Sequence, residues 1–349
     1  MLIGLPPGPN DRERVVSQPS RPAAPRAPRD HRDFDAAELA AIKRAAGARV
    51  SVVIPARDEA ATVGTVAGTL VDTLRDRVGL VDEVVVVDAG STDATGRVAA
   101  AAGARVVRQA EVLPERGDAP GKGEAMWKGL AACDGDLVVY VDADVVDIGP
   151  RFVTGLLGPL LTDPSVTLVK ACYDRPLHLD GHLHPHGGGR VTELLVRPLL
   201  ATFWPELARL LQPLAGEVAA RRELLVGLPF VRGYGVELAM LLDVAAAHGA
   251  GSIAQVDLGR RVHVHQPLDA LGRMAAELLH VAVGRLHEAG RLSTAAPLGT
   301  ILPQPVRDEA GRPGLTTTDI VVGQRPPLGS ARHRPTDTDD GDRHDHHSA

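Results

Sequence analysis

Residues 136 to 150 read "DLVVYVDADVVDIGP" and place two carboxylates, Asp142 and Asp144, directly after a short apolar run. Side chains two residues apart in an extended strand point to the same side, so these two carboxylates converge and repel each other. A cation between them would remove the repulsion, and Mg²⁺ is commonly held by one or two carboxylates together with the phosphates of a substrate. The stretch therefore predicts a buried strand that ends at a site for a phosphate-bearing ligand.

Valine-rich runs alternate with helical patterns on the N-terminal side of this stretch. The predicted strands are "RVSVVIPA" (49–56), "DEVVVVDAG" (82–90) and "ARVVRQ" (104–109), with helices expected at about 60–75 and 93–102. Strands that are apolar on both faces belong to parallel sheets covered by helices on both sides. We therefore predict an α/β fold whose ligand lies beyond the carboxyl ends of the strands.

Polar residues follow the first two strands at the edge where a nucleotide would lie. Taken alone, the "STDAT" segment is more often a plain cap of the next helix than a binding loop, since Ser, Thr and Asp are good N-cap residues. The expected nucleotide contacts at these two strand ends are Pro55, Ala56, Asp58, Glu59, Asp88 and Ser91.

Lys122 stands between two glycines in "APGKGEAMWKGL", at the predicted start of a helix. Backbone N–H groups and an ammonium group can meet an anion together at such a helix start. The spacing is not that of a Walker A loop, and an exposed lysine in a turn is the alternative interpretation.

Composition is that of an ordinary globular protein, with 349 residues, 44% hydrophobic, 23% charged and a formal net charge of -6. The last fourteen residues hold five Asp and one Arg, so the remaining chain is close to neutral and a general nucleic-acid surface is not expected. Cys133 and Cys172 lack metal or redox spacing and indicate core positions in a reducing compartment. No signal peptide or run of about 18 apolar residues is present, so we expect a cytoplasmic protein without a membrane span.

Four segments, "VVIPARDE", "VVVVDAGSTD", "GKGEAMWKG" and "YVDAD", resemble in their order the family 2 glycosyltransferases and their relatives of the GT-A fold. Three later segments are more specific and resemble the glucosyl-3-phosphoglycerate synthases, retaining enzymes of glycosyltransferase family 81. These are "GGGRVTELLVRPLL" (187–200), "PFVRGYGVELAMLLD" (229–243) and "QVDLGRRVHVHQPL" (255–268). The resemblance covers roughly residues 36 to 325.

The resemblance implies transfer of glucose from UDP-glucose to the 2-hydroxyl of 3-phosphoglycerate, with retention and with Mg²⁺ or Mn²⁺ as cofactor. It implies that Asp144 and His263 hold the metal and that Asp142 holds the ribose or the sugar. Glu237 and Asp144 are the expected catalytic residues, with Glu237 near the acceptor hydroxyl or the donor glucose. The further donor contacts implied are Lys122, Ala143, Tyr234 and Arg261.

An acceptor with a phosphate and a carboxylate needs several donors and positive charge. In "GGGRVTEL" the glycines let the backbone approach, and an arginine and a threonine precede a predicted helix. The expected acceptor contacts are Gly189, Arg190, Thr192 and His265. Retention leaves two mechanisms open, a covalent intermediate and front-face attack, and we expect front-face attack.

The sequence departs from the family pattern at three of these positions. Ala143 replaces an expected serine, whose side chain would point away from the metal, and Asp58 replaces a common asparagine near the uridine. His265 stands where the family pattern has an asparagine that contacts the acceptor.

Two other classes of function remain as alternatives. One is another GT-A transferase, such as a mannosyl-3-phosphoglycerate synthase using GDP-mannose, or an enzyme with a lipid-phosphate acceptor. The other is a nucleotide-sugar binding protein without turnover, or a nucleotidyltransferase, although the glycine-rich loop that the latter needs after its first strand is missing.

The expected organisation is a tail at 1–33, a GT-A domain at 34–300, an arm at 301–325 and an acidic, histidine-containing tail at 326–349, both tails being disordered. Within the domain, 34–150 would bind the nucleotide sugar and 151–300 would form a helical acceptor half. Apolar residues at helical spacing in 191–212 and 268–289 indicate packing on the sheet or on a second subunit. A homodimer is expected, partly because the resemblance implies one.

Overall fold

The computed structural model describes residues 23–174, 177–179, 182–184, 189–261, 267–293, 297–307 and 313–331. These residues form one eight-stranded sheet in the order β1-β11-β6-β9-β5-β2-β3-β4. Every strand is parallel to its neighbours except β9, which is antiparallel to both β5 and β6. The strands are β1 (Arg29–Asp30), β2 (Val50–Ala56), β3 (Glu83–Asp88), β4 (Arg105–Arg108), β5 (Leu137–Tyr140), β6 (Leu168–Asp174), β9 (Val218–Arg221) and β11 (Ile253–Arg260).

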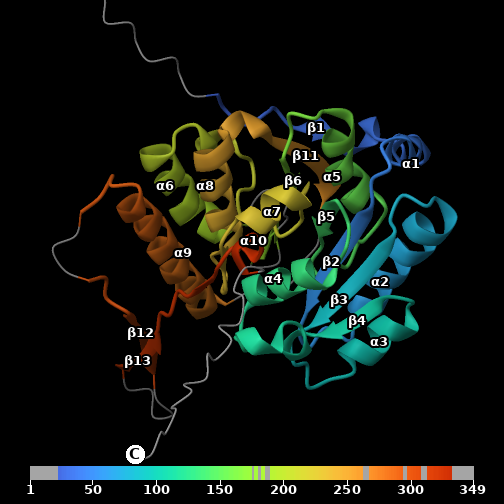
Figure 1. The fold of residues 1–349 in the computed structure, drawn as a ribbon. Coiled ribbons are helices and arrows are strands. Elements are labelled where there is room, and N and C mark those ends of the chain that lie inside the picture. The colour runs from blue at the N-terminus through green and yellow to red at the C-terminus, as the bar shows by residue number, and fades with distance from the viewer. Residues whose placement is uncertain are drawn as a thin grey trace, which may run out of the picture.

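Helices cover both faces of the sheet (Figure 1). One face carries α1 (Ala36–Ala45), α2 (Val63–Leu70), α3 (Thr95–Ala101) and α5 (Arg151–Thr162). The other carries α4 (Lys122–Ala132), α6 (Arg197–Phe203), α7 (Arg222–Gly227), α8 (Val236–His248), α9 (Leu268–Glu288) and α10 (Leu328–Ala331). The predicted class, a mostly parallel α/β sheet covered by helices, is confirmed.

Alternation along each central strand fills the two layers of core. Val52 and Ile54 of β2 pack with the α2 and α5 side, whereas Val53 packs with the α4 and α8 side. Val139 and Val138 of β5 divide in the same way. Since successive side chains of a strand point to opposite faces, a continuous apolar run is what a sheet buried on both faces requires.

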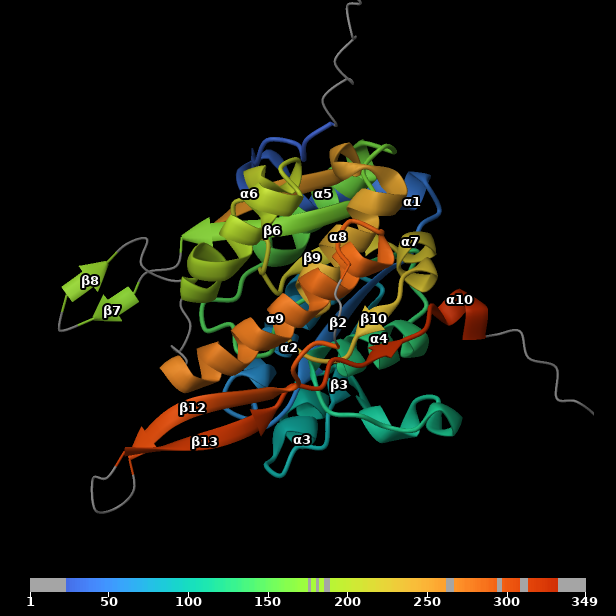
Figure 2. The same cartoon turned by 90° about the vertical axis from the view of Figure 1, so that its left-hand side faces the viewer.

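Three small two-stranded sheets lie outside the main sheet: β7 (Leu177–Leu179) with β8 (His182–His184), β10 (Phe230–Val231) with β14 (Gln324–Arg325), and β12 (Ile301–Arg307) with β13 (Pro313–Asp319). The β12–β13 hairpin extends away from the body (Figure 2). The β10–β14 pair instead brings the C-terminal segment back against the domain.

Several predicted boundaries differ from the structure. The N-terminal tail was expected to end at residue 33, but Arg29 and Asp30 pair with Val256 and Asp257 in β11. The C-terminal tail was expected to begin at residue 326, but 328–331 is helical and Leu328 is buried. The expected helix at 60–75 is α2 continued by a π-helix, Val71–Arg77. Tertiary contacts, which local composition does not report, fix these ends.

Both cysteines are buried and unpaired, as their spacing predicted. None of the helices formed by the described residues combines the length and the apolar composition needed to cross a bilayer.

Candidate active site

The sheet brings the carboxyl ends of β2, β3 and β5 to one edge, where Ala56 and Asp88 are register partners. The antiparallel strand β9 starts at this edge, because Val218 pairs with Tyr140 at the end of β5. Asp142, which follows β5, and Glu217, which precedes β9, therefore come together. Arg261 directly follows β11 and donates its backbone N–H to the carbonyl of Asp174 at the end of β6.

Two cationic side chains relieve the repulsion between Asp142 and Asp144. Lys122 Nζ, at the start of α4, lies 2.5 Å from Asp142 Oδ1 and 2.8 Å from Glu237 Oε1. Arg261 Nη2 lies 3.0 Å from Asp142 Oδ2 and 3.0 Å from Asp144 Oδ1. Lys122, Asp142, Asp144, Glu237 and Arg261, all predicted as site residues, thus form one connected cluster.

A deeper layer of this cluster was not predicted. Glu217 is fully buried, and its Oε1 lies 3.3 Å from Arg261 Nη2. The Tyr173 hydroxyl donates to Glu217 Oε2 at 2.8 Å and accepts from Arg261 Nη1 at 3.1 Å. The only signal in the sequence was a lone glutamate at the start of an apolar strand, "GEVAA", which fits an exposed strand end equally well.

Gly216 has no side chain, and the Asp142 carboxylate and the Lys122 ammonium group occupy the space where one would lie. A Cβ atom at this position would overlap the Asp142 carboxylate and lie 2.5 Å from Lys122 Nζ. Any larger residue would therefore displace the Lys122–Asp142 pair.

Opposite charges keep both partners of that pair ionised. Burial alone would raise the pKa of Asp142, but Lys122 and Arg261 together hold it well below its usual range. Burial would likewise lower the pKa of Lys122, but Asp142 and Glu237 hold it above its usual value. Lys170 of β6 is buried behind the cluster, and burial lowers its pKa to about 8 although nearby carboxylates oppose the change.

The loops after β2 and β3 are tied together by their own polar groups. Asp58 has a left-handed backbone (φ 56°), and its Oδ1 accepts from the backbone N–H and the hydroxyl of Thr92 at 2.7 and 3.0 Å. Its own N–H donates to Ser91 Oγ at 3.0 Å, and Ser91 N–H donates to Asp88 Oδ1 at 2.9 Å. The capping interpretation of Ser91 is wrong, because its hydroxyl joins the two loops and α3 begins only at Thr95.

Asp144 is the most accessible carboxylate of the cluster, with half of its side chain exposed. Burial raises the pKa of the neighbouring Glu59, and the charge of Asp144 raises it further. These oxygens suit a hard divalent cation. Within the described ranges, no three His, Cys, Asp or Glu side chains are grouped closely enough to hold one, and His263, the third ligand implied by the resemblance, lies outside them together with His265.

The remaining predicted residues fall in three places. Ala143 is buried in the core on the α2 and α5 side, and its predicted place beside the donor stays a prediction. Tyr234 is about half exposed and donates its N–H to Glu277 Oε2 at 2.9 Å. Gly189 (φ 75°), Arg190 and the buried Thr192 begin the helical segment before α6, so their role toward an acceptor stays a prediction.

Comparison with known proteins agrees with this geometry. The glycosyl transferase family 2 model matches residues 51–187. Glucosyl-3-phosphoglycerate synthase of Petrotoga mobilis is 43% identical over 291 residues, which cover 83% of this chain and 89% of that protein. The loops after β2 and β3 and the Asp142–Asp144 motif lie inside the family 2 match, whereas Glu237 and Arg261 lie beyond it.

Two solved structures are similar in both fold and sequence. Mannosyl-3-phosphoglycerate synthase from Rubrobacter xylanophilus has a TM-score of 0.80 at 41% identity, covering 86% of this chain and 96% of that one. Glucosyl-3-phosphoglycerate synthase from Mycobacterium tuberculosis, in complex with Mn²⁺, UDP and phosphoglyceric acid, has a TM-score of 0.75 at 41% identity, covering 89% and 99%.

The sheet, the carboxylate and cation cluster at its carboxyl edge and these matches together identify the chain as a glycosyltransferase of the GT-A fold. The similarity extends over nearly the full length of the relatives and includes the segments that carry Glu237 and Arg261. The chain belongs to the glucosyl-3-phosphoglycerate synthase family.

Proposed function

We propose that this chain transfers glucose from UDP-glucose to the 2-hydroxyl of 3-phosphoglycerate. The observation that carries the proposal is a set of ion pairs at the carboxyl edge of the sheet, which joins Lys122, Asp142, Glu237 and Arg261. The relatives are named for the product, glucosyl-3-phosphoglycerate, and solved structures of one hold Mn²⁺ with UDP or UDP-glucose and phosphoglyceric acid.

The donor would lie over the ends of β2, β3 and β5. Strand β2 ends at Pro55 and Ala56. Beside this strand end, hydrogen bonds link Asp58, Ser91 and Asp88 into a fixed polar surface that would meet the uridine half of the donor. A preformed loop loses little conformational entropy when it binds a ligand. Glu59 and Tyr234 are further donor contacts in this proposal.

A divalent ion, Mg²⁺ or Mn²⁺, fits the exposed Asp144 carboxylate, with His263 as the further ligand implied by the family. When bound, such an ion neutralises charge on the diphosphate of the departing UDP. Support comes from the excess of carboxylate oxygens at Glu59, Asp142 and Asp144 and from the metal-containing relatives.

Glu237 holds Lys122 in place and would orient the reacting groups. Its carboxylate is buried and paired with an ammonium group at 2.8 Å, an arrangement that makes it a weak nucleophile. We therefore favour front-face attack with retention, in which the departing phosphate assists removal of the acceptor proton. Gly189, Arg190, Thr192 and His265 would bind the phosphate and carboxylate of the acceptor.

Assembly as a homodimer in the cytoplasm completes the proposal. Large apolar side chains are exposed on α9 and on the β12–β13 hairpin, with Leu268 77%, Ile301 62% and Leu315 69% exposed. Large exposed apolar patches commonly mark an interface between proteins, and we propose that these three side chains belong to one. The proposed organisation is a domain at about 34–300 followed by a C-terminal arm. Its outer ends differ from the predicted ones, because Arg29 and Asp30 join the sheet and 328–331 is helical.

A product assay tests the reaction. The protein is incubated with 3-phosphoglycerate, Mg²⁺ and either UDP-glucose or GDP-mannose, and the product is identified by mass spectrometry and by NMR of the anomeric proton. We expect an α-linked glucosyl product from UDP-glucose that disappears when EDTA is added. A product from GDP-mannose alone would favour the mannosyl activity named for the Rubrobacter relative, and no product from either donor would refute the transferase proposal.

A further inference from the structure

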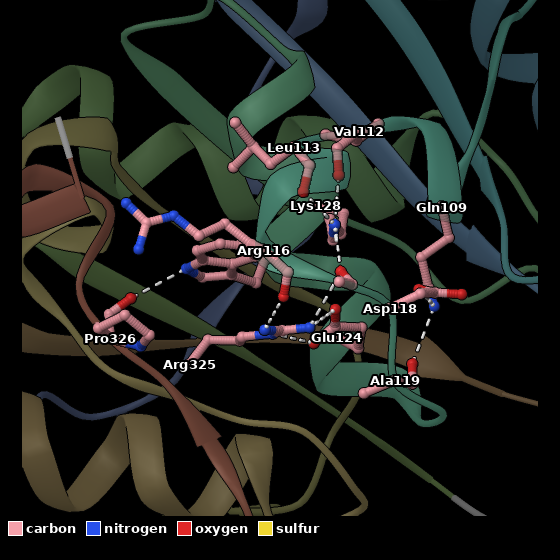
Figure 3. Close-up of polar contacts among 12 residues, drawn as sticks. Gln109, Val112, Leu113, Arg116, Asp118, Ala119, Glu124, Lys128, Arg325 and Pro326 are labelled. Carbon is pink, nitrogen blue, oxygen red and sulfur yellow. Dashed lines mark hydrogen bonds and ion pairs between the residues drawn. The ribbon is translucent and has the colours of Figure 1, made fainter. Parts of the chain in front are cut away.

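The C-terminal segment returns to the domain and is fastened to α4, about 200 residues away in the sequence (Figure 3). Arg325 of β14 meets Glu124 in the first turn of α4, with Nε 2.6 Å from Oε2 and Nη2 2.6 Å from Oε1. Glu124 is fully buried, and the side chain of Arg325 is 14% exposed. The guanidinium and the carboxylate thus form two parallel hydrogen bonds in a site that is largely shielded from water.

The same guanidinium also fixes the loop that precedes α4. Arg325 donates to the carbonyls of Arg116 at 2.7 Å and Gly117 at 3.3 Å. Lys128, buried one turn further along α4, donates to the carbonyls of Leu113 at 3.1 Å and Gly117 at 2.9 Å (Figure 3). The largely buried Arg325 and the fully buried Lys128 therefore satisfy neighbouring carbonyls of one loop.

Trp127 joins this contact to the C-terminal segment from the other side. Its indole Nε1 donates to the carbonyl of Pro326 at 3.1 Å, and the guanidinium carbon of Arg325 lies 5.3 Å from the ring centroid. The contact between α4 and β14 thus combines an ion pair, a cation–π contact and a hydrogen bond.

The contact between Arg325 and Glu124 involves the elements that position Lys122 and Glu237 at the candidate active site. Glu124 is two residues after Lys122, and β14 pairs with β10, which leads into the first turn of α8 and Glu237. The N–H of Glu124 donates to the carbonyl of Arg232 at 3.2 Å, and a Cβ on Gly123 would overlap the carbonyl of Val231. Arg325 therefore links α4, whose first turn supplies Lys122, to β10, which leads into the first turn of α8 and Glu237.

We propose that Glu124 and Arg325 are positioning residues for glucosyl transfer, setting the distance between Lys122 and Glu237 through α4 and the β10–β14 pair. This inference rests on the proposed function. Neither residue belongs to the cluster at the sheet edge, so their effect reaches the reaction through the backbone of α4 and β10. Small displacements of reacting groups can lower a rate by about 100-fold.

The test uses two variants of the full chain, Glu124→Gln and the double variant Glu124→Gln/Arg325→Met. The single variant leaves a buried guanidinium without its counter-charge and should lower both the melting temperature and kcat. The double variant removes that uncompensated charge and should recover most of the melting temperature. If the pair positions the reactive groups, kcat of the double variant stays at least about 10-fold below wild type while the Kd of UDP with Mg²⁺, measured by calorimetry, changes less than about 3-fold.

Asp243→Asn is the matched control, because Asp243 and Arg285 form a similar forked pair between α8 and α9, at 2.7 and 2.8 Å. It should lower the melting temperature without a comparable loss of kcat. Recovery of kcat together with stability in the double variant, or an equal loss of kcat in the control, would overturn the proposal.

Hydrogen exchange separates this inference from the proposed function. Peptides covering 109–124 and 230–240 should exchange faster in the double variant than in wild type and than in Asp243→Asn. If the wild type forms no product, the proposed function fails, and hydrogen exchange alone then tests the link between α4 and β10. Faster exchange in both peptides supports this link, whereas faster exchange in 109–124 alone overturns it.

Discussion

The Asp142 side chain is only 19% exposed and lies beside two further carboxylates, Asp144 and Glu217. This is stable only because Lys122 and Arg261 reach Asp142 from distant parts of the chain. A buried charge without partners would cost several kcal/mol. The cluster therefore depends on each member having a fixed place, and Gly216 is the residue that leaves room for it.

Gly216→Ala should disturb this arrangement directly, because the new methyl group would overlap the Asp142 carboxylate. Overpacking of this kind costs roughly 1–3 kcal/mol of stability. We expect a fall in kcat of at least about 10-fold, since the Lys122–Asp142 pair must separate. Gly227→Ala is the control, because a Cβ there meets nothing within 4 Å; a Gly216→Ala enzyme as active as this control would contradict the packing described.

Local motifs led to the prediction of Asp142, Lys122 and Asp88 as site residues, since each lies at the end of a strand or at the start of a helix, at the edge where a ligand is expected. The ion pairs that Asp142 forms were not predictable, because its partner Arg261 lies 119 residues away in the sequence. Glu217 and Lys170 were missed for a related reason: a single charge in or beside an apolar strand becomes informative only when its partners are known.

At the scale of elements, the parallel half of the sheet followed from alternating valine-rich strands and helices. The antiparallel strand β9 did not, because its direction is set by pairing with β5 and β6, which its four residues, Val218–Arg221, do not encode. Yet β9 is the element that brings Gly216 and Glu217 to the site.

Strand β6 contributes a buried lysine with a measurable effect of pH on stability. Burial lowers the pKa of Lys170 from 10.5 to about 8. Below pH 8 the amine is charged in both the folded and the unfolded chain. Between about pH 8 and 10.5 the folded protein releases the proton while the unfolded chain keeps it, so this group makes the protein more stable as pH rises.

The difference in unfolding free energy between wild type and Lys170→Met should therefore shift in favour of wild type from pH 8 to 10.5, by up to roughly 3 kcal/mol. Urea unfolding across this pH range measures it. A difference that stays constant with pH would show that Lys170 keeps its proton in the folded protein.

At the scale of the whole molecule, the C-terminal segment has two separate parts. Residues 324–331 return to the body and pack on α4 and α7, whereas the β12–β13 hairpin extends from it (Figure 2). The sequence predicted an arm at 301–325 but not the return, since the pairing of Arg325 with Glu124 depends on the completed fold.

The exposed hairpin leads to a prediction about assembly. Leu315→Asp on β13 should convert a dimer to a monomer, measured by light scattering after size-exclusion chromatography, because a buried charge would oppose association. Ile42→Asp on α1, at the other side of the molecule (Figure 1), should leave the dimer unchanged. A monomeric wild type would refute the proposed homodimer.

The most direct test of the account is the turnover of Glu237→Gln with UDP-glucose and 3-phosphoglycerate. This substitution keeps the shape of the side chain but removes the charge that holds Lys122 at 2.8 Å. We predict a kcat lowered by about 100-fold, with the Kd of UDP changed by less than about 3-fold and the protein still folded. A variant that forms glucosyl-3-phosphoglycerate at the wild-type rate would place the chemistry outside this cluster and contradict the account.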